Sequence, residues 1–447
     1  MCYNTLYNFH KNTGGRYVRL ERYTPDGTQE VLPRQCTNKM RMENAIATVF
    51  EGFGYQVAET PVMQFYDAFN THAGKIPQEM MYKFFDAQGR ILVLRPDITT
   101  CLARMVASKL DDGIYPKRLY YCGKVFRYID EYASGQREFC QAGIELFGAQ
   151  GDLADAEVIA CAIEALLAAG LECFQIEIGQ VEFCKAVIGQ TGLQGDEAEV
   201  LCTLIDKKDS LAIHEFLQDK SLDAESAALL ESLPTRFGGV EVFDSLETDK
   251  LSDKAVAALE NLKNVYSLLC DYGYEDYVSI DLSLVQGINR YTGIIFKGIT
   301  HGIGYSVCAG GRYDGLTGEF GTSLSAVGMA IGTDRLLTVL ERQNRLAEPE
   351  GAEFLVASAD AALGYRVLNE LREEGYVAEQ ALCGEDVVAL YAYAEANHIQ
   401  ALLMIAENET AWIHNLETDE KIPMNLHELL AHEHDEDCCC DACNGKD

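Results

Sequence analysis

The sequence predicts an α+β fold in which helices flank an antiparallel sheet, a helical insertion interrupts the sheet, and a small C-terminal α/β domain follows. Three observations predict it. The stretches 118–128 and 139–148 are strand-like and enclose a polar loop, as two antiparallel strands do. From about 190 to 272 the pattern is helical and charged, without glycine-rich loops. Residues 353–430 alternate strand-like and helix-like stretches, which is typical of a separate α/β domain.

The domain boundaries follow from length and local composition. A chain of 447 residues is long enough for two or three domains with sizeable cores. Residues 1–20 are irregular and rich in Asn, Gly and Tyr, so we expect an N-terminal extension before a main domain at 21–342. The polar stretch 343–352 indicates a linker before the α/β domain at 353–430. Residues 431–447 are acidic, Cys-rich and low in complexity, which predicts a disordered tail.

The elements of the main domain are predicted from periodicity and turn residues. In chain order these are a helix at about 37–53, a hairpin turning at 86–89, helices at 98–110 and 152–171, strands within 277–313, and a strand running into a helix at 324–342. Gly54 is expected to end the first helix. Asp152 or Asp155 is expected to cap the helix at 152–171.

The net charge of −34 disfavours binding to nucleic acid phosphates. It is concentrated at the C-terminal end, where residues 351–447 contain 21 acidic and 4 basic residues. No apolar run reaches the roughly 18 residues that span a membrane, and the N-terminus lacks the apolar core of a signal peptide. We therefore expect a cytoplasmic protein, in which most of the 16 cysteines are reduced and buried in apolar segments.

Two stretches carry polar residues that suit a binding site. In LRPDITT (94–100), Asp97 offers a carboxylate at a strand end, which would accept an ammonium group. The alternative is that Asp97 or Thr99 simply caps the following helix. In the strand after the polar loop, period-two alternation places Gln141 and Glu145 on one face, opposite Arg127. These groups make an amino-acid-sized polar pocket, unless this face of the sheet is exposed to solvent.

Two further stretches, GGRYDGL (310–316) and GMAIGTDRLL (328–337), complete an ordered set of motifs. Together the four stretches resemble the class II histidyl-tRNA synthetase catalytic domain over about Tyr23 to Leu340, and residues 353–430 resemble its anticodon-binding domain. The resemblance implies a class II aminoacyl-tRNA synthetase-like fold that binds histidine. It implies that Asp97, Thr99 and Gln141 hold the α-ammonium and that Glu145 and Tyr291 recognise the imidazole. It assigns Arg127 to the ATP phosphate or the aminoacyl carboxylate.

The stretch LVQGINRY (284–291) departs from the synthetase pattern. The arginine that stabilises charge during adenylate formation is replaced by Gln286, and the first tyrosine of the signature by Arg290. Asn289 stands where the signature has aspartate. Losing a fixed cation next to developing phosphate charge costs orders of magnitude in rate. In the loop after Arg127, Tyr128 replaces the usual histidine, and Asp130 and Glu131 add negative charge.

YTPDGTQEVLP, GRILVLRPDITT and RYTGIIF resemble a non-synthetase branch of this family, the regulatory subunits of ATP phosphoribosyltransferase. The resemblance implies a non-catalytic subunit without a cofactor, which forms a homodimer core and partners a short-form catalytic phosphoribosyltransferase. It further implies feedback by L-histidine and no tRNA or membrane partner. Because the signature arginine is absent, we expect Arg127 or Arg290 to bind the histidine carboxylate instead. The predicted histidine site then comprises Asp97, Thr99, Arg127, Gln141, Glu145, Arg290 and Tyr291. The alternatives are an active histidine-tRNA ligase or another paralogue that activates an amino acid.

The C-terminal tail contains possible ligands for a soft metal. Cys438, Cys439, Cys440 and Cys443 follow His432 and His434. Thiolates and imidazoles are suitable ligand types, but three adjacent cysteines do not easily point at one ion. We therefore predict no metal site and expect a solvated acidic tail.

Overall fold

The computed structural model describes residues 10–11, 17–18, 22–128, 136–220, 222–285, 290–348, 351–383, 386–406 and 410–430. The chain divides into two compact units, Met1–Leu346 and Ala347–Asp447, and the predicted linker spans this division. The N-terminal segment, expected to be irregular, contains a short antiparallel pair, β1 (His10–Lys11) and β2 (Tyr17–Val18). No helix in the described ranges is long and apolar enough to cross a membrane.

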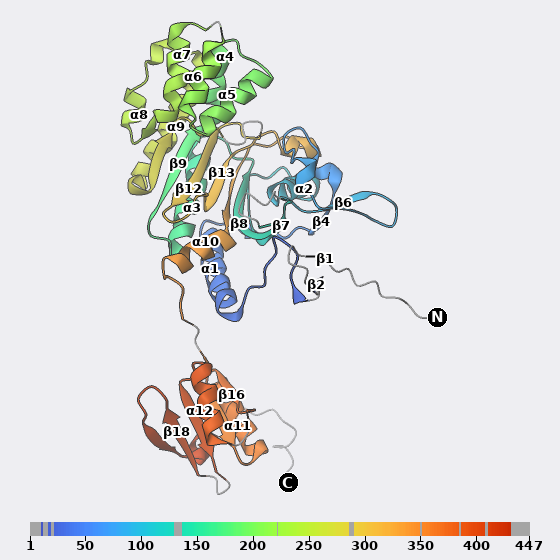
Figure 1. The fold of residues 1–447 in the computed structure, drawn as a ribbon, viewed down its shortest axis with the longest axis vertical. Helices are drawn as coiled ribbons and strands as arrows, with labels where there is room; N and C mark the ends of the chain where they lie inside the picture. The colour runs from blue at the N-terminus through green and yellow to red at the C-terminus, as the bar shows by residue number, and fades with distance from the viewer. Residues whose placement is uncertain are drawn as a thin grey trace. The chain divides into compact units, whose positions relative to one another are not determined.

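A nine-stranded sheet forms the centre of the first unit, in the order β10-β11-β9-β12-β13-β14-β8-β7-β3 (Figure 1). Neighbouring strands are antiparallel except for the pairs β11–β9 and β7–β3. The strands are β3 (Gln56–Val57), β7 (Lys117–Phe126), β8 (Glu138–Phe147), β9 (Phe174–Gln180), β10 (Phe237–Gly238), β11 (Val278–Asp281), β12 (Ile294–Thr300), β13 (Cys308–Arg312) and β14 (Ala326–Gly332). The predicted antiparallel pairing of 118–128 with 139–148 is confirmed by β7 and β8.

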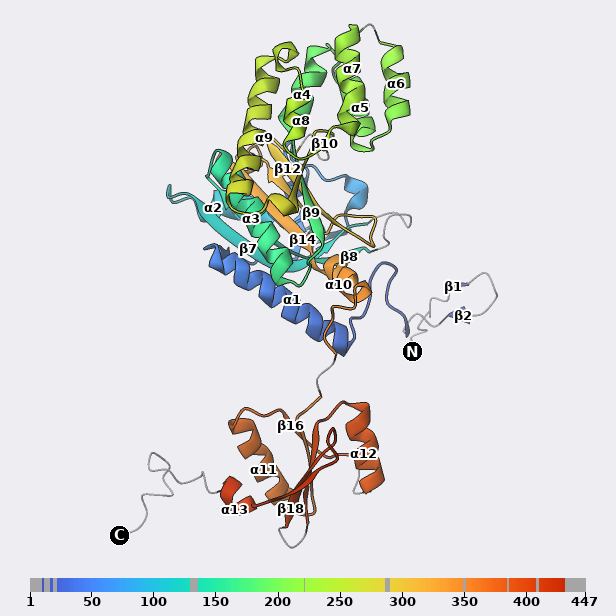
Figure 2. The same ribbon diagram turned by 90° about the vertical axis from the view of Figure 1, so that its left-hand side faces the viewer.

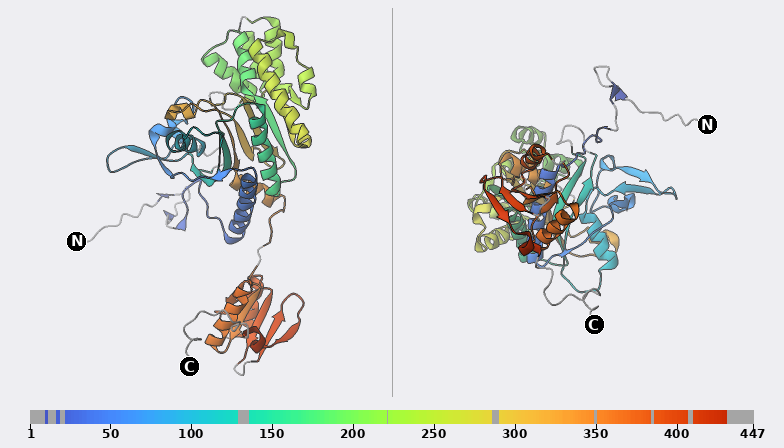
Figure 3. Two further views of the ribbon diagram at one scale, coloured as in Figure 1. Left: turned by 180° about the vertical axis from the view of Figure 1, so that it is seen from behind. Right: turned by 90° about the horizontal axis from the view of Figure 1, so that it is seen from below.

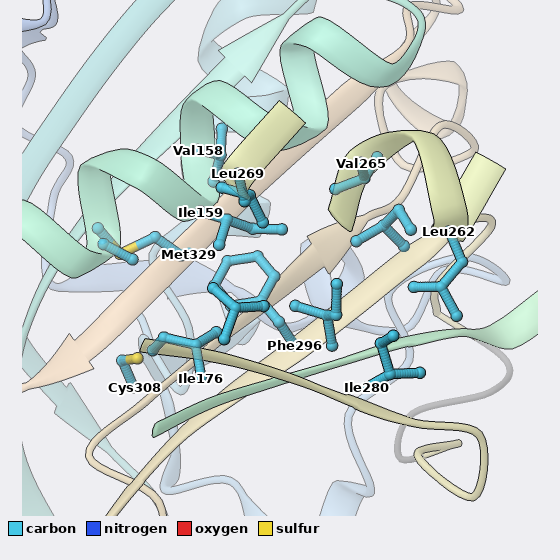
Figure 4. Packing of buried hydrophobic residues seen from close by; sticks show 14 of the residues in the cluster. Val158, Ile159, Ile176, Leu262, Val265, Leu269, Ile280, Phe296, Cys308 and Met329 are labelled. Carbon is cyan, nitrogen blue, oxygen red and sulfur yellow. The ribbon is translucent and has the colours of Figure 1, made fainter. Parts of the chain in front are cut away.

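Long helices cover one face of this sheet (Figure 2). They are α1 (Pro33–Gly52), α3 (Asp152–Ala168), α9 (Asp253–Asp271) and α10 (Thr333–Arg342). Helix α3 is apolar almost all round because it packs between the sheet, α1 and α9, and an apolar helix of this kind is buried on most sides. Figure 4 shows Val158 and Ile159 of α3 and Leu262, Val265 and Leu269 of α9 above Ile176, Ile280 and Phe296 of the sheet.

Two sequence-based details of these helices were wrong. Helix α1 begins at Pro33, four residues earlier than predicted, because proline is well suited to the first turn of a helix. Neither Asp152 nor Asp155 caps α3, whose N-cap residue is Gly151. Asp155 instead forms a buried ion pair with Arg312. The predicted end of α1 is consistent with Gly54, which has a positive φ of 82°.

The opposite face of the sheet carries helix α2 and a small three-stranded sheet (Figure 3). Their bounds are α2 (Thr99–Lys109), β4 (Met63–Phe65), β5 (Lys83–Phe85) and β6 (Ile91–Leu94). The pairing of β5 with β6 confirms the predicted hairpin. The two faces of β7 belong to different hydrophobic cores. Tyr120 packs under α1 and α3 on one face, whereas Tyr121 packs with α2 on the other. Short 3-10 helices lie at Tyr66–Phe69, Gln78–Met80, Leu233–Thr235, Thr248–Lys250, Glu275–Tyr277 and Thr317–Phe320.

The helical insertion begins about nine residues earlier than predicted, immediately after β9. Its helices are α4 (Val181–Gln190), α5 (Asp196–Asp206), α6 (Ser210–Gln218), α7 (Ala224–Ser232) and α8 (Glu241–Asp244), and it ends with α9. Figure 1 shows α4 to α8 stacked beyond one end of the strands β9 and β12. Strand β9 itself was not predicted. An ion pair of 2.9 Å between Lys208 and the buried Asp281 joins the insertion to the end of β11.

The second unit is a five-stranded sheet with helices. Its elements are β15 (Phe354–Ser358), α11 (Ala361–Glu373), β16 (Ala378–Gln380), α12 (Val387–Ala396), β17 (Ala401–Ile405), β18 (Ala411–Asn415), β19 (Lys421–Met424) and α13 (Leu426–Leu429). The strand order is β16-β15-β17-β18-β19, parallel among the first three and antiparallel beyond. The predicted α/β alternation is present, and the antiparallel pair β18–β19 adds to it.

The cysteines of the described ranges are free thiols. Cys101, Cys161 and Cys202 are buried, as predicted. Cys122 is exposed and Cys270 only half-buried, contrary to the expectation. Cys122 shares the Tyr120 face of β7 but is exposed, whereas Tyr120 and Tyr121 are both buried.

Candidate functional site

A cavity of about 340 Å³ lies on the α2 side of the large sheet, over β7, β8, β13 and β14. All seven residues of the predicted site line it. They are Asp97, Thr99, Arg127, Gln141, Glu145, Arg290 and Tyr291. These residues come from four separate stretches of the chain, which the antiparallel strands and the start of α2 bring together. Their role in holding a ligand stays a prediction.

Glu145 lies at the bottom of this cavity and is 1% exposed. Thr99 Oγ1 donates to Glu145 Oε1 at 2.5 Å, and the hydroxyl of Tyr313 donates to Oε2. Burial raises the pKa of Glu145 to about 8, while these two hydrogen bonds act to lower it. At neutral pH the carboxyl is therefore mostly protonated. The alternative that this face of β8 is exposed to solvent is wrong, because α2 and Tyr313 cover it.

A glycine opposite Glu145 makes room for the buried carboxyl. Gly328 on β14 is the cross-strand partner of Glu145. A Cβ atom at Gly328 would lie 1.8 Å from Glu145 Oε2, closer than any non-bonded contact allows. Gly143 is constrained in the same way, since its Cβ would lie 2.6 Å from the Tyr121 hydroxyl oxygen. The small residues of the GMAIG motif thus shape the floor of the cavity.

Asp97 has two roles in the structure. Its Oδ1 accepts a 2.7 Å hydrogen bond from the Thr100 backbone N–H in the first turn of α2. Its Oδ2 accepts a 3.1 Å charged hydrogen bond from Arg290 Nη1. Burial acts to raise the pKa of Asp97, but the positive charges of Arg290 and Arg127 outweigh it and hold the pKa below its ordinary value. The N-cap residue of α2 is Ile98, so neither Asp97 nor Thr99 is the cap itself, although Asp97 accepts a hydrogen bond from the first turn. The role of Asp97 as an acceptor for a ligand ammonium stays a prediction.

Three arginines, Arg127, Arg290 and Arg335, make the cavity electropositive. Arg127 Nε donates to the Pro96 carbonyl at 2.7 Å, and its guanidinium lies 5.6 Å from the centre of the Phe139 ring. Arg335, at the start of α10, donates to the Ser306 carbonyl at 3.3 Å. Burial lowers the pKa of Arg127, although the guanidinium remains charged at any accessible pH. The cavity therefore favours anionic groups next to its aromatic walls.

Three residues of the cavity wall were not predicted from the sequence to belong to the site. Tyr121 and Tyr313 are almost fully buried there, at 3% and 2% exposure. Period-two alternation on β7 and the GGRYDGL motif contained the signal, because Tyr121 pairs with Gly143 on the same face as Glu145. Arg335 was noticed as the start of a helix but not placed in the site.

Several sequence-based assignments lie outside the described residues. These are Gln286 and Asn289 of the altered signature, Asp130 and Glu131 of the loop after Arg127, and the whole cysteine-rich tail. Tyr128 is 46% exposed, and the Arg137 guanidinium lies 4.5 Å from its ring centre. No group of three or more His, Cys, Asp or Glu side chains in the described ranges is placed to hold a metal ion.

A second and larger cavity, of about 1110 Å³, adjoins the first. Arg290 lines both cavities and is the residue that they share. The other walls come mainly from the segment between β4 and β5, including Tyr66, His72 and Lys75. The Arg290 side chain is 27% exposed, and it stands at the boundary between the two cavities.

Residues 27–336 match the histidyl-tRNA synthetase family. The ATP phosphoribosyltransferase regulatory subunit of Acetivibrio thermocellus is 41% identical over 410 residues, which cover 91% of this chain and 98% of that protein. The chain belongs to this family of synthetase-like regulatory subunits. The regulatory subunit of Ruminiclostridium cellulolyticum is 35% identical over 399 residues, or 89% of this chain and 95% of that protein. The family resemblance found in the sequence is confirmed.

Solved structures agree with this family. A Bacillus halodurans C protein described as an ATP phosphoribosyltransferase regulatory subunit/histidyl-tRNA synthetase superposes with a TM-score of 0.77 at 28% identity, covering 86% of this chain and 98% of that one. Histidyl-tRNA synthetase from Nostoc sp. PCC 7120 has a TM-score of 0.78 at 22% identity, covering 91% and 97%. The second likeness concerns the fold alone. The predicted class II synthetase-like fold is confirmed.

Proposed function

We propose that this chain is the non-catalytic partner of a short-form catalytic ATP phosphoribosyltransferase in the first step of histidine biosynthesis. In this proposal L-histidine occupies the cavity over β8 and mediates feedback inhibition. The subunit works in the cytoplasm and does not bind tRNA. The single observation that carries the ligand assignment is the arrangement of an acidic, a cationic and a hydroxyl-rich wall around a space of about 340 Å³.

Each wall suits one part of a histidine zwitterion. Asp97 is the anion for the α-ammonium, with Thr99 and Gln141 beside it. Glu145 and Tyr291 are the partners for the imidazole, deep in the cavity where a planar ring excludes water. Arg127 or Arg290 takes the carboxylate. Charge-assisted hydrogen bonds of this kind are about twice as strong as neutral ones, which supports recognition of a small zwitterion.

Two features lead us to propose that the chain does not aminoacylate tRNA: the altered signature at 284–291 and the negative charge of the C-terminal unit. Gln286 stands where the synthetase has an arginine, so charge that develops on the α-phosphate would lack a fixed cation. The acidic C-terminal unit offers few Lys or Arg side chains for tRNA phosphates. The alternative of an active synthetase or an amino-acid-activating paralogue predicts histidine-dependent pyrophosphate exchange at a rate typical of synthetases. Such exchange would overturn the proposal.

An exposed apolar sheet face supports assembly through the synthetase-like unit. Met63 and Phe65 of β4 pair across the small sheet with Leu94 and Leu92 and are 60% and 46% exposed. Paired residues of neighbouring strands share a face, so these four form one outward patch. Contiguous exposed apolar patches mark interaction sites. We assign this patch to a homodimer contact, which light scattering tests: a stable monomer at micromolar concentration would contradict it.

The decisive experiment is co-purification of this chain with the short catalytic subunit, followed by activity assays with and without histidine. We expect a complex whose phosphoribosyltransferase activity requires this chain and falls when histidine is added. The Glu145→Ala variant should still assemble but respond only to much higher histidine concentrations. Full catalytic activity of the short subunit alone, with unchanged histidine sensitivity, would contradict the proposal.

A further inference from the structure

The acidic group assigned to the ligand ammonium already has two partners within the protein. Arg290 Nη1 donates to Asp97 Oδ2 at 3.1 Å, and the other carboxylate oxygen is held by the Thr100 N–H at 2.7 Å. Among the described residues, nothing accepts a hydrogen bond from Arg290 Nε, which is buried. The guanidinium is therefore paired on one side only and can form a further charged hydrogen bond.

The charges around this ion pair exclude a purely cationic ligand. Arg127, Arg290 and Arg335 all line the cavity, and Asp97 is the one carboxylate there that is ionised at neutral pH, because Glu145 is mostly protonated. The lining thus carries a net positive charge before any ligand enters. A ligand that adds only an ammonium group increases this charge in an enclosed site, where repulsion is stronger than in water. A zwitterion adds no net charge.

We propose that Arg290 makes the ligand α-carboxylate obligatory: the cavity accepts an intact amino-acid zwitterion and rejects amines of the same shape that lack the carboxylate. This inference rests on the proposed histidine site. On binding, the ligand ammonium replaces the guanidinium at Asp97, and the guanidinium turns to the ligand carboxylate. After this exchange both Asp97 and Arg290 again have a partner of opposite charge.

An amine without a carboxylate cannot complete the exchange. Its ammonium must displace Arg290 from Asp97 but supplies no anion in exchange, which is strongly unfavourable for the half-buried guanidinium. The carboxylates that remain near its path, Glu79 and Glu199, line the larger cavity and not the smaller one. The position of Arg290 makes the exchange sterically feasible, because its side chain borders the larger cavity as well as the smaller one. Arg127 does not offer the same coupling, since its Nε is bound to the Pro96 carbonyl rather than to Asp97.

The test is calorimetry on the full-length chain with L-histidine, its amino alcohol histidinol, and histamine. The unmodified protein should bind L-histidine at least roughly tenfold more tightly than either amine, the loss expected for a missing charge-assisted contact. Arg290→Gln should bind L-histidine more weakly yet bind histamine more tightly than the unmodified protein, because Asp97 is then free. A merely structural role for Arg290 would weaken both ligands together.

Two further variants keep the test decisive. Arg290→Lys retains the positive charge and should still favour histidine over histamine, while Lys254→Gln removes an exposed cation from α9 and should change neither affinity. Equal binding of histidine and histamine by the unmodified protein, or a parallel loss of both in Arg290→Gln, overturns the carboxylate requirement alone. Absence of histidine binding to the unmodified protein overturns the proposed histidine site as well.

Discussion

Thr99 and Glu145 are 46 residues apart in the sequence, and their side chains meet at 2.5 Å in the floor of the cavity. Thr99 opens helix α2 and Glu145 lies on β8, so this contact joins the helix to the sheet. With Tyr313 on the other oxygen, the carboxyl of Glu145 is held in one orientation. A group so fixed and enclosed is suited to recognise a ligand with little loss of side-chain entropy.

We predict that Glu145→Ala weakens histidine binding at least roughly tenfold, because a buried imidazole nitrogen that loses its hydrogen-bond partner costs about 1–3 kcal/mol. Isothermal calorimetry measures the change. Glu260→Ala, which removes an exposed carboxylate from α9, is the matched control and should bind normally. Unchanged affinity in Glu145→Ala would mean that the sensor lies elsewhere, for example in the C-terminal unit.

The raised pKa of Glu145 makes stability depend on pH in a defined direction. The folded protein keeps this proton up to about pH 8, whereas the unfolded chain releases it near its ordinary value of 4.5. Between these values the folded state binds more protons, so its stability falls as pH rises, by at most about 1.4 kcal/mol per pH unit. Urea unfolding from pH 5 to 8 should therefore show a steeper loss for the unmodified protein than for Glu145→Gln.

Asp155, whose pKa burial raises to about 6, acts in the same direction but is common to both proteins and cancels in the difference. Asp97 has the opposite sign, since its lowered pKa stabilises the fold above the ordinary Asp value. It too is present in both proteins. Parallel stability curves for the unmodified protein and Glu145→Gln would show that Glu145 ionises normally in the fold.

Gly328→Ala should remove histidine binding, because the new Cβ would overlap Glu145 Oε2, 1.8 Å away, and would crowd the Ile144 carbonyl. The carboxyl must move out of its position between Thr99 and Tyr313. Gly189→Ala is a matched control in helix α4, where nothing lies within 4 Å of the added carbon, and a helical alanine stabilises by up to about 1 kcal/mol. Thermal unfolding and calorimetry together separate folding from binding. Normal histidine affinity in Gly328→Ala would contradict the packing argument.

The buried pair of Arg312 and Asp155 should be sensitive to loss of one partner. Arg312 Nη2 lies 2.7 Å from Asp155 Oδ1, and the two side chains are 9% and 2% exposed. Asp155→Ala leaves a buried guanidinium with the half-exposed Asp314 and the Ala149 carbonyl as partners, so we expect a loss of about 3–5 kcal/mol in the free energy of unfolding. Urea denaturation measures it. Glu247→Ala, in an exposed pair with Lys250, should stay within about 0.5 kcal/mol. A similarly small effect of Asp155→Ala would show that Asp314 and the Ala149 carbonyl suffice.

Local patterns predicted most of the elements. The missed start of α1 had a local cause, Pro33, whereas the wrong cap of α3 had a tertiary one. The pairing of 118–128 with 139–148 and the hairpin at 86–89 depend on alternation and turn residues, which are local. Strand β9 was missed, although it occupies an interior position of the sheet between β11 and β12. The expected cap of α3 was wrong because Asp155 finds a stronger partner in Arg312, which lies 157 residues away.

The amino-acid sequence by itself determined the family and the fold class, because the order of its motifs resembles that of the synthetase-like subunits. That resemblance, and not periodicity alone, led to the seven residues that gather around one cavity. The tertiary structure alone decided how those residues are engaged. It paired Asp97 with Arg290, buried Glu145 between two hydroxyl donors, and added Tyr121 and Tyr313 to the wall. The physical reason is that charge state and hydrogen-bond partners depend on burial and on neighbours distant in sequence, and these exist only once the strands have packed.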